Sequence, residues 1–373
     1  MDPNHPTRRR FVAGISSSVM LASAGGRLLR NVETSVPAAN PGLRWPKPIG
    51  SPVIESLRPV IEHSIDVATN VDKIVEVAGW MAYEELPMPH MSVPYGLDKN
   101  PPVAMDFIMV ATSINSAFTD FKTHVKFEVE YEGQLRSDSD AMVACLKRAM
   151  DSGVPILDGK FLAGITRPQF EKIFAGNMEI PMLEEKLQCF HEVGQVLAER
   201  YDGRFYNFIK SCPPKLYANG EGLVDRLVKE FPRFNDASSF EGREIKFYKL
   251  AQLGFWGMYS GLLSTGAFPL DDISKMSAFA DYIIPVALRL MGITRYSPAL
   301  EKAVDSFQLI PRDSTQEIEI RAHSLYATAL LTEEINKMRG AGQQIIIPQL
   351  DARLWSHYHT TLWPHHLTRT IMY

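Results

Sequence analysis

Apolar residues recur every three or four positions through most of this chain, the spacing that places side chains on one face of an α-helix. The clearest case is residues 315–337, whose stripe is formed by Ile318, Ala322, Leu325 and Leu330. Residues 124–131 alternate apolar and polar side chains instead, and Glu132-Gly133 then offers a tight turn. The sequence therefore predicts a mainly α-helical fold with a small antiparallel β-sheet.

Helix start signals occur further along the chain. Thr166 and Gln169 form a capping-box pattern, and in the middle of the chain the pattern predicts helices beginning at Asp236 or Ser238. The last helix begins near Pro348, because proline suits a first helical turn.

Acidic and aromatic residues mark two of these helices. Glu317 and Glu319 are expected on a solvated helix start, since acidic side chains favour helix N-termini. On the last helix Asp351, Trp355 and Tyr358 share one face, which presents a carboxylate beside an aromatic surface.

The first 52 residues differ from the rest. Arg8-Arg9-Arg10 precedes a weakly apolar stretch at 13–24, and prolines recur between 37 and 52. This pattern resembles a twin-arginine export signal, although a transit peptide for an organelle or a disordered basic tail would look similar. We predict a signal-like or disordered segment and linker at 1–52 and one domain at 53–373.

Charge and cysteine content exclude several classes of function. The formal net charge of -4 over 373 residues argues against direct nucleic-acid binding, which needs clustered basic surface. Three cysteines without CxxC spacing indicate neither a disulfide framework nor a zinc site. The sequence contains no apolar run of about 18 residues, the length that would predict a membrane span. No signal in it indicates an oligomeric state. His357 and His359 point apart on a helix, so we expect no metal site there.

Two aspartates lie in unusually apolar surroundings, in Phe279-Ala280-Asp281-Tyr282 and in Leu350-Asp351-Ala352. Carboxylates rarely occupy such positions unless something binds or reacts there. These segments are the strongest candidates for a functional site.

Several stretches together resemble the queuosine salvage family, in that family's order. They include Gly79-Trp80, Ile114 to Phe118, Gly153 to Ile156, Phe240 to Gly242, Phe247 to Gln252, Phe279 to Tyr282, Glu317 to Arg321, Leu350-Asp351, His366 and Arg369. The resemblance implies a helical fold like that of DNA glycosylases and hydrolysis of queuosine 5'-phosphate to queuine, for tRNA modification. It implies a small nucleotide as partner, no cofactor, and a cytoplasmic location that conflicts with an export signal.

The resemblance also assigns residues. Asp351 matches the family's catalytic carboxylate, while Phe279 and Asp281 match positions that bind the base. A carboxylate beside the sugar would stabilise the ribosyl cation that forms when an N-glycosidic bond breaks. Further substrate-binding candidates are Ala352 and Ser356.

Two cationic residues are candidates for the 5'-phosphate, Lys249 and Arg321, because phosphate binding needs an ammonium or guanidinium group. The alternative for Arg321 is a pair with Glu317, one turn earlier on the same helix.

The chain departs from the family at several positions. Glu84 stands where the family has a histidine, and Ser356 replaces a base-contacting aspartate. An arginine and a glutamine become Ile283 and Val286, and Thr119 replaces a tryptophan. Either the enzyme cleaves a different modified nucleoside, or Glu84 takes over the contact to the cationic amine of queuine. A catalytically silent nucleobase-binding protein is the rival from another class.

Overall fold

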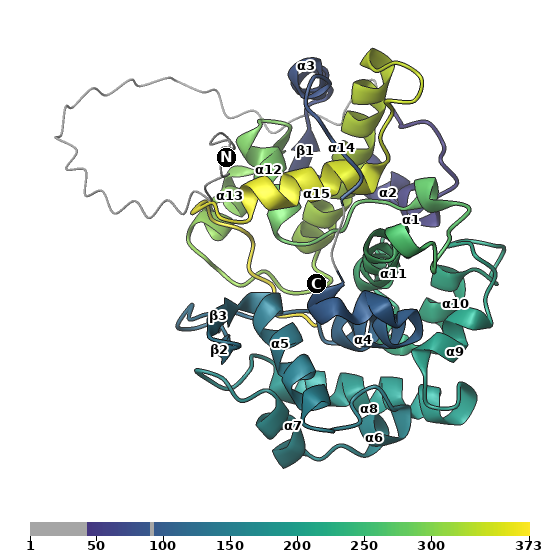
Figure 1. The fold of residues 1–373 in the computed structure, drawn as a ribbon. Helices are drawn as coiled ribbons and strands as arrows, with labels where there is room; N and C mark the ends of the chain where they lie inside the picture. The colour runs from purple at the N-terminus through teal and green to yellow at the C-terminus, as the bar shows by residue number, and fades with distance from the viewer. Residues whose placement is uncertain (1–42, 90–92) are drawn as a thin grey trace, which may run out of the picture. The chain divides into compact units, whose positions relative to one another are not determined.

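The computed structural model describes residues 43–89 and 93–373 (Figure 1). The fold is mainly α-helical, as predicted, and among these residues the strands form three separate two-stranded antiparallel pairs instead of one sheet. The arginine-rich segment at 8–24 lies outside the described residues. Within 43–89 and 93–373, we find no helix that combines the length and the apolar character needed to cross a membrane. The likeness to DNA glycosylases stays a prediction.

The elements follow one another with short connections. The α-helices are α1 (Pro52–Ser56), α2 (Arg58–His63), α3 (Val71–Met81), α4 (Pro101–Ser113), α5 (Asp138–Asp151), α6 (Gly159–Gly164), α7 (Arg167–Ile173), α8 (Leu183–Arg200), α9 (Phe205–Lys210), α10 (Leu223–Glu230), α11 (Lys249–Gly261), α12 (Ile283–Leu290), α13 (Pro298–Asp305), α14 (Thr315–Met338) and α15 (Ile347–Tyr358). The 3-10 helices are η1 (Pro94–Lys99), η2 (Pro232–Phe234), η3 (Leu263–Thr265) and η4 (Ile273–Lys275). The strands are β1 (Val67–Thr69), β2 (Glu128–Tyr131), β3 (Gln134–Ser137), β4 (Ala237–Phe240), β5 (Arg243–Lys246) and β6 (Thr294–Tyr296).

The predicted hairpin forms, and a second one was missed. β2 pairs with β3 across Glu132-Gly133, where both residues have positive φ, as a two-residue hairpin turn requires. Helices predicted to begin at Asp236 or Ser238 are wrong, because β4 and β5 pair there. Their turn is the same dipeptide, Glu241-Gly242, again with positive φ at both positions. That dipeptide was the signal in the sequence for the second hairpin.

Residues 43–51, which we assigned to a linker, pack against α14. The Trp45 ring stacks on Tyr326 with centroids 5.4 Å apart. Arg44 forms an ion pair with Glu333 at 2.7 Å, and the backbone N–H of Lys47 donates to the same carboxylate. These contacts join the segment before α1 to the folded body.

Helix α14 is buried on nearly all sides, which corrects the expectation of a solvated start. Glu317 and Glu319 are fully buried. Glu319 accepts hydrogen bonds from the backbone N–H groups of Ile65, Asp66 and Val67, at 2.7 to 3.0 Å. A buried carboxylate needs such donors to offset the loss of water. Glu319 therefore fixes the segment that leads into β1 against the centre of α14.

His323, one turn after Glu319, is also hydrogen-bonded to residues around β1. Its ring nitrogens lie 2.8 Å from the hydroxyl of Thr69 and 2.9 Å from that of Ser64. The ring is completely buried, and burial lowers its pKa to about 3.

This burial predicts a specific sensitivity to acid. The folded pKa lies below the unfolded value of about 6.5, so only the unfolded chain binds this proton between pH 6.5 and 3. His323 therefore contributes stability above pH 6.5 that is lost as the pH falls. We expect the free energy of unfolding of wild type, relative to His323→Gln, to be about 2 kcal/mol smaller at pH 5 than at pH 8. Urea denaturation measures it, and a difference that does not vary with pH would contradict the assignment.

Candidate active site

A pocket of about 400 Å³ opens between the segment 115–118, the start of α5, helix α11, the segment 279–282 and helix α15. This volume falls within the range of small-molecule sites, about 300–1,000 Å³. Phe279, Asp281, Asp351, Lys249 and Trp355 all line it. The structure thus brings together residues that lie about a hundred positions apart in the sequence.

Asp351 sits on the first turns of α15 and is buried. Its Oδ1 accepts a hydrogen bond of 2.8 Å from the backbone N–H of Phe279. Burial raises the pKa of Asp351 well above its usual value, and the negative charge of Asp281 raises it further. The Phe279 N–H and the Lys249 ammonium oppose that shift.

Asp281 lies at the turn into α12. Its Oδ1 accepts from the backbone N–H groups of Ile283 and Ile284, at 2.8 and 3.1 Å, so it caps the helix that follows. Burial raises the pKa of Asp281, against the Lys249 ammonium and these two N–H groups. Because both hydrogen bonds end on Oδ1, the other oxygen remains available to a ligand.

Lys249 supplies the positive charge of the pocket from the first residue of α11. Burial lowers its pKa, while the carboxylates of Asp281, Asp351 and Asp236 act in the opposite direction. The buried charged groups of the pocket are therefore two carboxylates and one ammonium, and a third carboxylate, that of the half-buried Asp138, also lines it.

Arg321, the other phosphate candidate, is not among the residues that line the pocket. Its guanidinium forms a two-pronged ion pair with Asp236, at 2.9 and 2.5 Å, and lies 3.6 Å from Glu317. It also donates to the carbonyl of Ala280 at 3.1 Å. All of these partners are buried protein groups, which favours the structural alternative for this arginine.

The ion pair between Arg321 and Asp236 also contacts the backbone of Lys249. Asp236 accepts from the backbone N–H of Lys249 at 3.2 Å, and its carbonyl accepts from those of Phe247 and Tyr248. Arg321 and Asp236 thus hold the start of α11 and the segment 279–281 together.

Glu84 also lies outside the pocket lining. Its carboxylate forms a two-pronged ion pair with Arg353 of α15, at 2.6 and 3.0 Å, and its carbonyl accepts from Arg339. Gln349 donates to the carbonyl of Leu86 at 2.7 Å. Glu84 therefore anchors the segment after α3 to α15, an arrangement that does not support the contact to a substrate amine.

Helix α15 presents the expected mixed face. Ala352, Trp355 and Ser356 line the pocket beside Asp351, and His359 extends the same face. The Trp355 and His359 rings stack with centroids 4.2 Å apart. Tyr358, expected on this face, packs instead against the hydrophobic core.

The opposite wall was not predicted from the sequence. Asn115 and Ser116 line the pocket, and the buried Ser116 hydroxyl has no hydrogen-bond partner among the described residues. Behind this wall the buried Lys186 ammonium donates to the carbonyls of Ala117 and Pro181, at 2.8 and 2.7 Å. No sequence motif announces a buried lysine that binds carbonyls, so only the structure reveals it.

Among the described residues, no group of histidine, cysteine and acidic side chains has an arrangement that could hold a metal ion.

Comparison with known proteins places this chain in a family. A family model described as queuosine salvage protein matches residues 95–373. The chain belongs to this family.

The relatives agree with the match. A protein of Sphaerobacter thermophilus is 32% identical over 326 residues, which cover 86% of this chain and 97% of the relative. A protein of Mus musculus is 29% identical over 316 residues, 81% of this chain and 91% of the relative. A protein of Schizosaccharomyces pombe is 30% identical over 248 residues, 62% and 70% of the two chains. All three bear the name queuosine 5'-phosphate N-glycosylase/hydrolase.

The positions that were expected to depart from the family pattern do not all surround the carboxylates. Ser356 lines the main pocket, whereas Thr119, Ile283 and Val286 line a smaller adjoining one. Glu84 lines neither.

The placement of Arg321 predicts how a conservative substitution behaves. Arg321→Lys keeps the charge but loses the two-pronged geometry, so it should lower the free energy of unfolding by about 2–4 kcal/mol. The ratio of kcat/KM for a nucleotide to that for its nucleoside should stay unchanged. Arg295→Lys, at an exposed position of β6, is the matched control and should alter neither quantity. A variant of normal stability whose ratio falls would show that Arg321 binds phosphate after all.

Proposed function

We propose that this protein hydrolyses the N-glycosidic bond of queuosine 5'-phosphate and releases queuine. The observation that carries the proposal is the buried group of Asp281, Asp351 and Lys249 in a pocket of small-molecule size, in a chain whose relatives are named for this reaction.

The three charges favour one proton on the carboxylate pair. With Lys249 protonated, a single proton shared by Asp281 and Asp351 leaves the group neutral overall. Two ionised carboxylates would leave a net negative charge on buried groups, which is costly. Such a pair titrates as a unit, and in the singly protonated form it offers both a hydrogen-bond donor and a negative charge.

The hydrogen-bond donor and the negative charge of the pair are both needed when the bond between C1' of the ribose and the base nitrogen breaks. The electron pair leaves with the base, and positive charge develops on the ribosyl carbon. Ionised Asp351 beside that carbon stabilises this charge. In the free protein the pKa of Asp351 is raised more strongly than that of Asp281, but the growing charge on the ribosyl carbon favours the ionised form of Asp351. The proton of the pair therefore passes to Asp281 as the bond breaks. Water then adds its hydroxyl to C1', and its remaining proton replaces the one given to the base.

Asp281 and Phe279 act on the leaving base. Queuine is a 7-deazaguanine and lacks the N7 that many purine-cleaving enzymes protonate, so help must come through hydrogen bonds to the ring edge. The free oxygen of Asp281 is suited to that role, and Phe279 offers an aromatic face for stacking. Ala352 and Ser356 complete the wall on α15.

Lys249 is the remaining candidate for the 5'-phosphate, because Arg321 is committed to Asp236. With one proton on the carboxylate pair, the Lys249 ammonium faces a single negative charge and can still attract a phosphate. The partner of the proposed enzyme is therefore a small nucleotide, with no direct contact to nucleic acid.

The first rival is an N-glycosylase for another modified nucleoside, and the second is a silent nucleobase-binding protein. Asp351→Asn separates an enzyme from a nucleobase-binding protein. The variant loses the negative charge, while its amide oxygen can still accept the hydrogen bond from the Phe279 N–H. We expect the wild-type protein to release queuine from queuosine 5'-phosphate and the variant to be slower by a thousand-fold or more, a loss typical when charge stabilisation is removed. Substrate affinity should change by only a few fold.

Liquid chromatography with mass detection follows the free base. Asp271→Asn, at an exposed position, is the matched control and should retain full activity. No release by folded wild-type protein would refute the queuosine assignment, and turnover by Asp351→Asn would refute the catalytic role of that residue.

The charge of Lys249 predicts the position of the pH profile. Because its ammonium lowers the pKa of both carboxylates, Lys249→Met should move the whole profile of kcat/KM to higher pH. Lys249→Arg keeps the positive charge and should leave the profile in place, whatever its height. A Lys249→Met profile that is lower but not displaced would show that the lysine does not tune the pair.

A further inference from the structure

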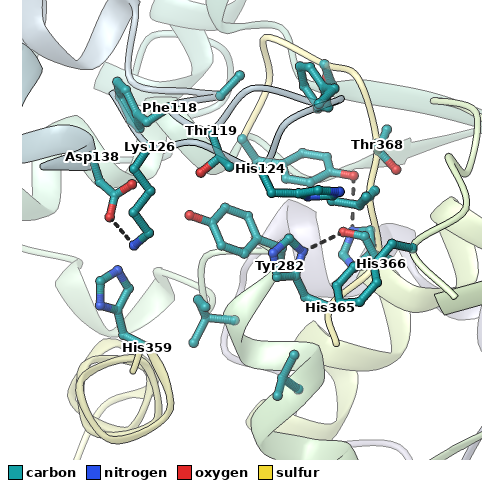
Figure 2. A pocket seen from close by; sticks show the side chains of 18 of the residues that line it. Phe118, Thr119, His124, Lys126, Asp138, Tyr282, His359, His365, His366 and Thr368 are labelled. Atoms are coloured by element: carbon teal, nitrogen blue, oxygen red, sulfur yellow. Dashed lines mark hydrogen bonds and ion pairs between the residues drawn. The ribbon is translucent and has the colours of Figure 1, made fainter. Parts of the chain in front are cut away.

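A second pocket of about 210 Å³ adjoins the first (Figure 2). The two share part of their walls, including Phe118, Asp138, Tyr282 and His359. The side pocket begins directly beyond Asp281, because the next two residues, Tyr282 and Ile283, line it. A base held by Asp281 in the main pocket would therefore direct one edge toward this space.

The charges of the side pocket are mainly negative. Asp120 and Asp138 line it with only one ammonium, that of Lys126. Hydrogen bonds from the N–H groups of Lys122 and Thr123 and from the Thr123 hydroxyl lower the pKa of Asp120 and keep it ionised. Two carboxylates against one ammonium favour a positively charged occupant.

Asp138 is the carboxylate best placed to meet such an occupant, because it lines both pockets. Its Oδ2 accepts from the Lys126 ammonium at 2.7 Å, the pair joined by a dashed line in Figure 2. Among the described residues, Oδ1 receives no hydrogen bond from another side chain. A protonated amine could therefore bind Asp138 without displacing Lys126.

The remaining walls suit a hydroxylated group. Hydroxyls come from Thr119, Thr361 and Thr370. His366 is almost fully buried, and its Nδ1 has no partner among the described residues. Burial lowers the pKa of His366 to about 3, so the ring is neutral and offers that nitrogen as a hydrogen-bonding group. Such an orphaned buried nitrogen costs free energy unless a ligand or water satisfies it.

We infer that this side pocket is a second subsite of the same binding site and takes a hydroxylated, positively charged substituent carried by the base. The inference rests on the proposed function for the position of the base near Asp281. The side chain of queuine, with its protonated amine and its diol, is of this class. Asp138 would then be the residue that distinguishes a substituted 7-deazaguanine from a plain one.

A phosphate is the main alternative occupant, since Lys126 and the histidines could attract an anion. It is disfavoured because Lys126 is already paired with Asp138 and because a dianion would face both carboxylates. The two occupants make opposite predictions for the loss of the Asp138 charge.

Calorimetric titration of the full chain with queuine and with 7-deazaguanine tests the inference without any turnover. The wild type should bind queuine at least ten-fold more tightly than 7-deazaguanine. Asp138→Asn removes the charge, and Thr119→Phe fills the pocket, so each should reduce this ratio about ten-fold, as expected for a charge-assisted hydrogen bond or a blocked subsite. Asp140→Asn, an exposed acid on the same turn of α5, should keep the wild-type ratio.

Two results would overturn the inference. One is a ratio that is the same in the wild type, Asp138→Asn and Thr119→Phe. The other is an unchanged ratio combined with tighter binding of 7-deazaguanosine 5'-phosphate, but not of 7-deazaguanosine, to Asp138→Asn, which would place the phosphate here. Failure of the proposed function looks different: the wild type would prefer queuine yet release none from the nucleotide.

Discussion

The ion pair between Arg321 and Asp236 is the interaction on which the site depends. Arg321 is buried on α14, and its guanidinium joins Asp236 to the carbonyl of Ala280, between Phe279 and Asp281. Asp236 in turn receives the backbone N–H of Lys249, while the Phe279 N–H binds Asp351. A single buried pair therefore sets the positions of all three charged groups. Rings on both sides, Phe247 and Tyr373, lie 3.9 and 4.3 Å from the guanidinium and shield it from water.

Burial has opposite consequences for polar residues whose hydrogen bonds are all satisfied within the fold and for those that face the pocket. Glu319 and His323 on α14 meet donors or acceptors from the chain that crosses them, so their desolvation is offset and they act as structural anchors. Asp281, Asp351 and Lys249 are satisfied only in part and keep free capacity toward the pocket. Unbalanced burial of this kind shifts pKa values and is common where chemistry takes place.

Much of the fold and part of the site could be predicted from the sequence. The helical period gave the fold class, and apolar neighbours singled out Asp281 and Asp351, which the structure places in one pocket. The structural alternative for Arg321 was open from the sequence, but its main partner Asp236 could not be predicted, because it is 85 positions away and directly precedes a hairpin that was taken for a helix start. Nor could the buried start of α14, since an acid at a helix N-terminus looks the same in sequence whether water or a crossing backbone surrounds it.

The central claim is that the buried carboxylate pair holds one proton at neutral pH. Carboxyl carbon NMR of the protein labelled at aspartate, compared with Asp281→Asn and Asp351→Asn, measures this directly. We predict one resonance, absent from one or both variants, that still reports a protonated carboxyl at pH 6, well above the usual aspartate value of about 4. Two resonances that both titrate near pH 4 would contradict the account, because the pair would then carry no proton to give to the leaving base.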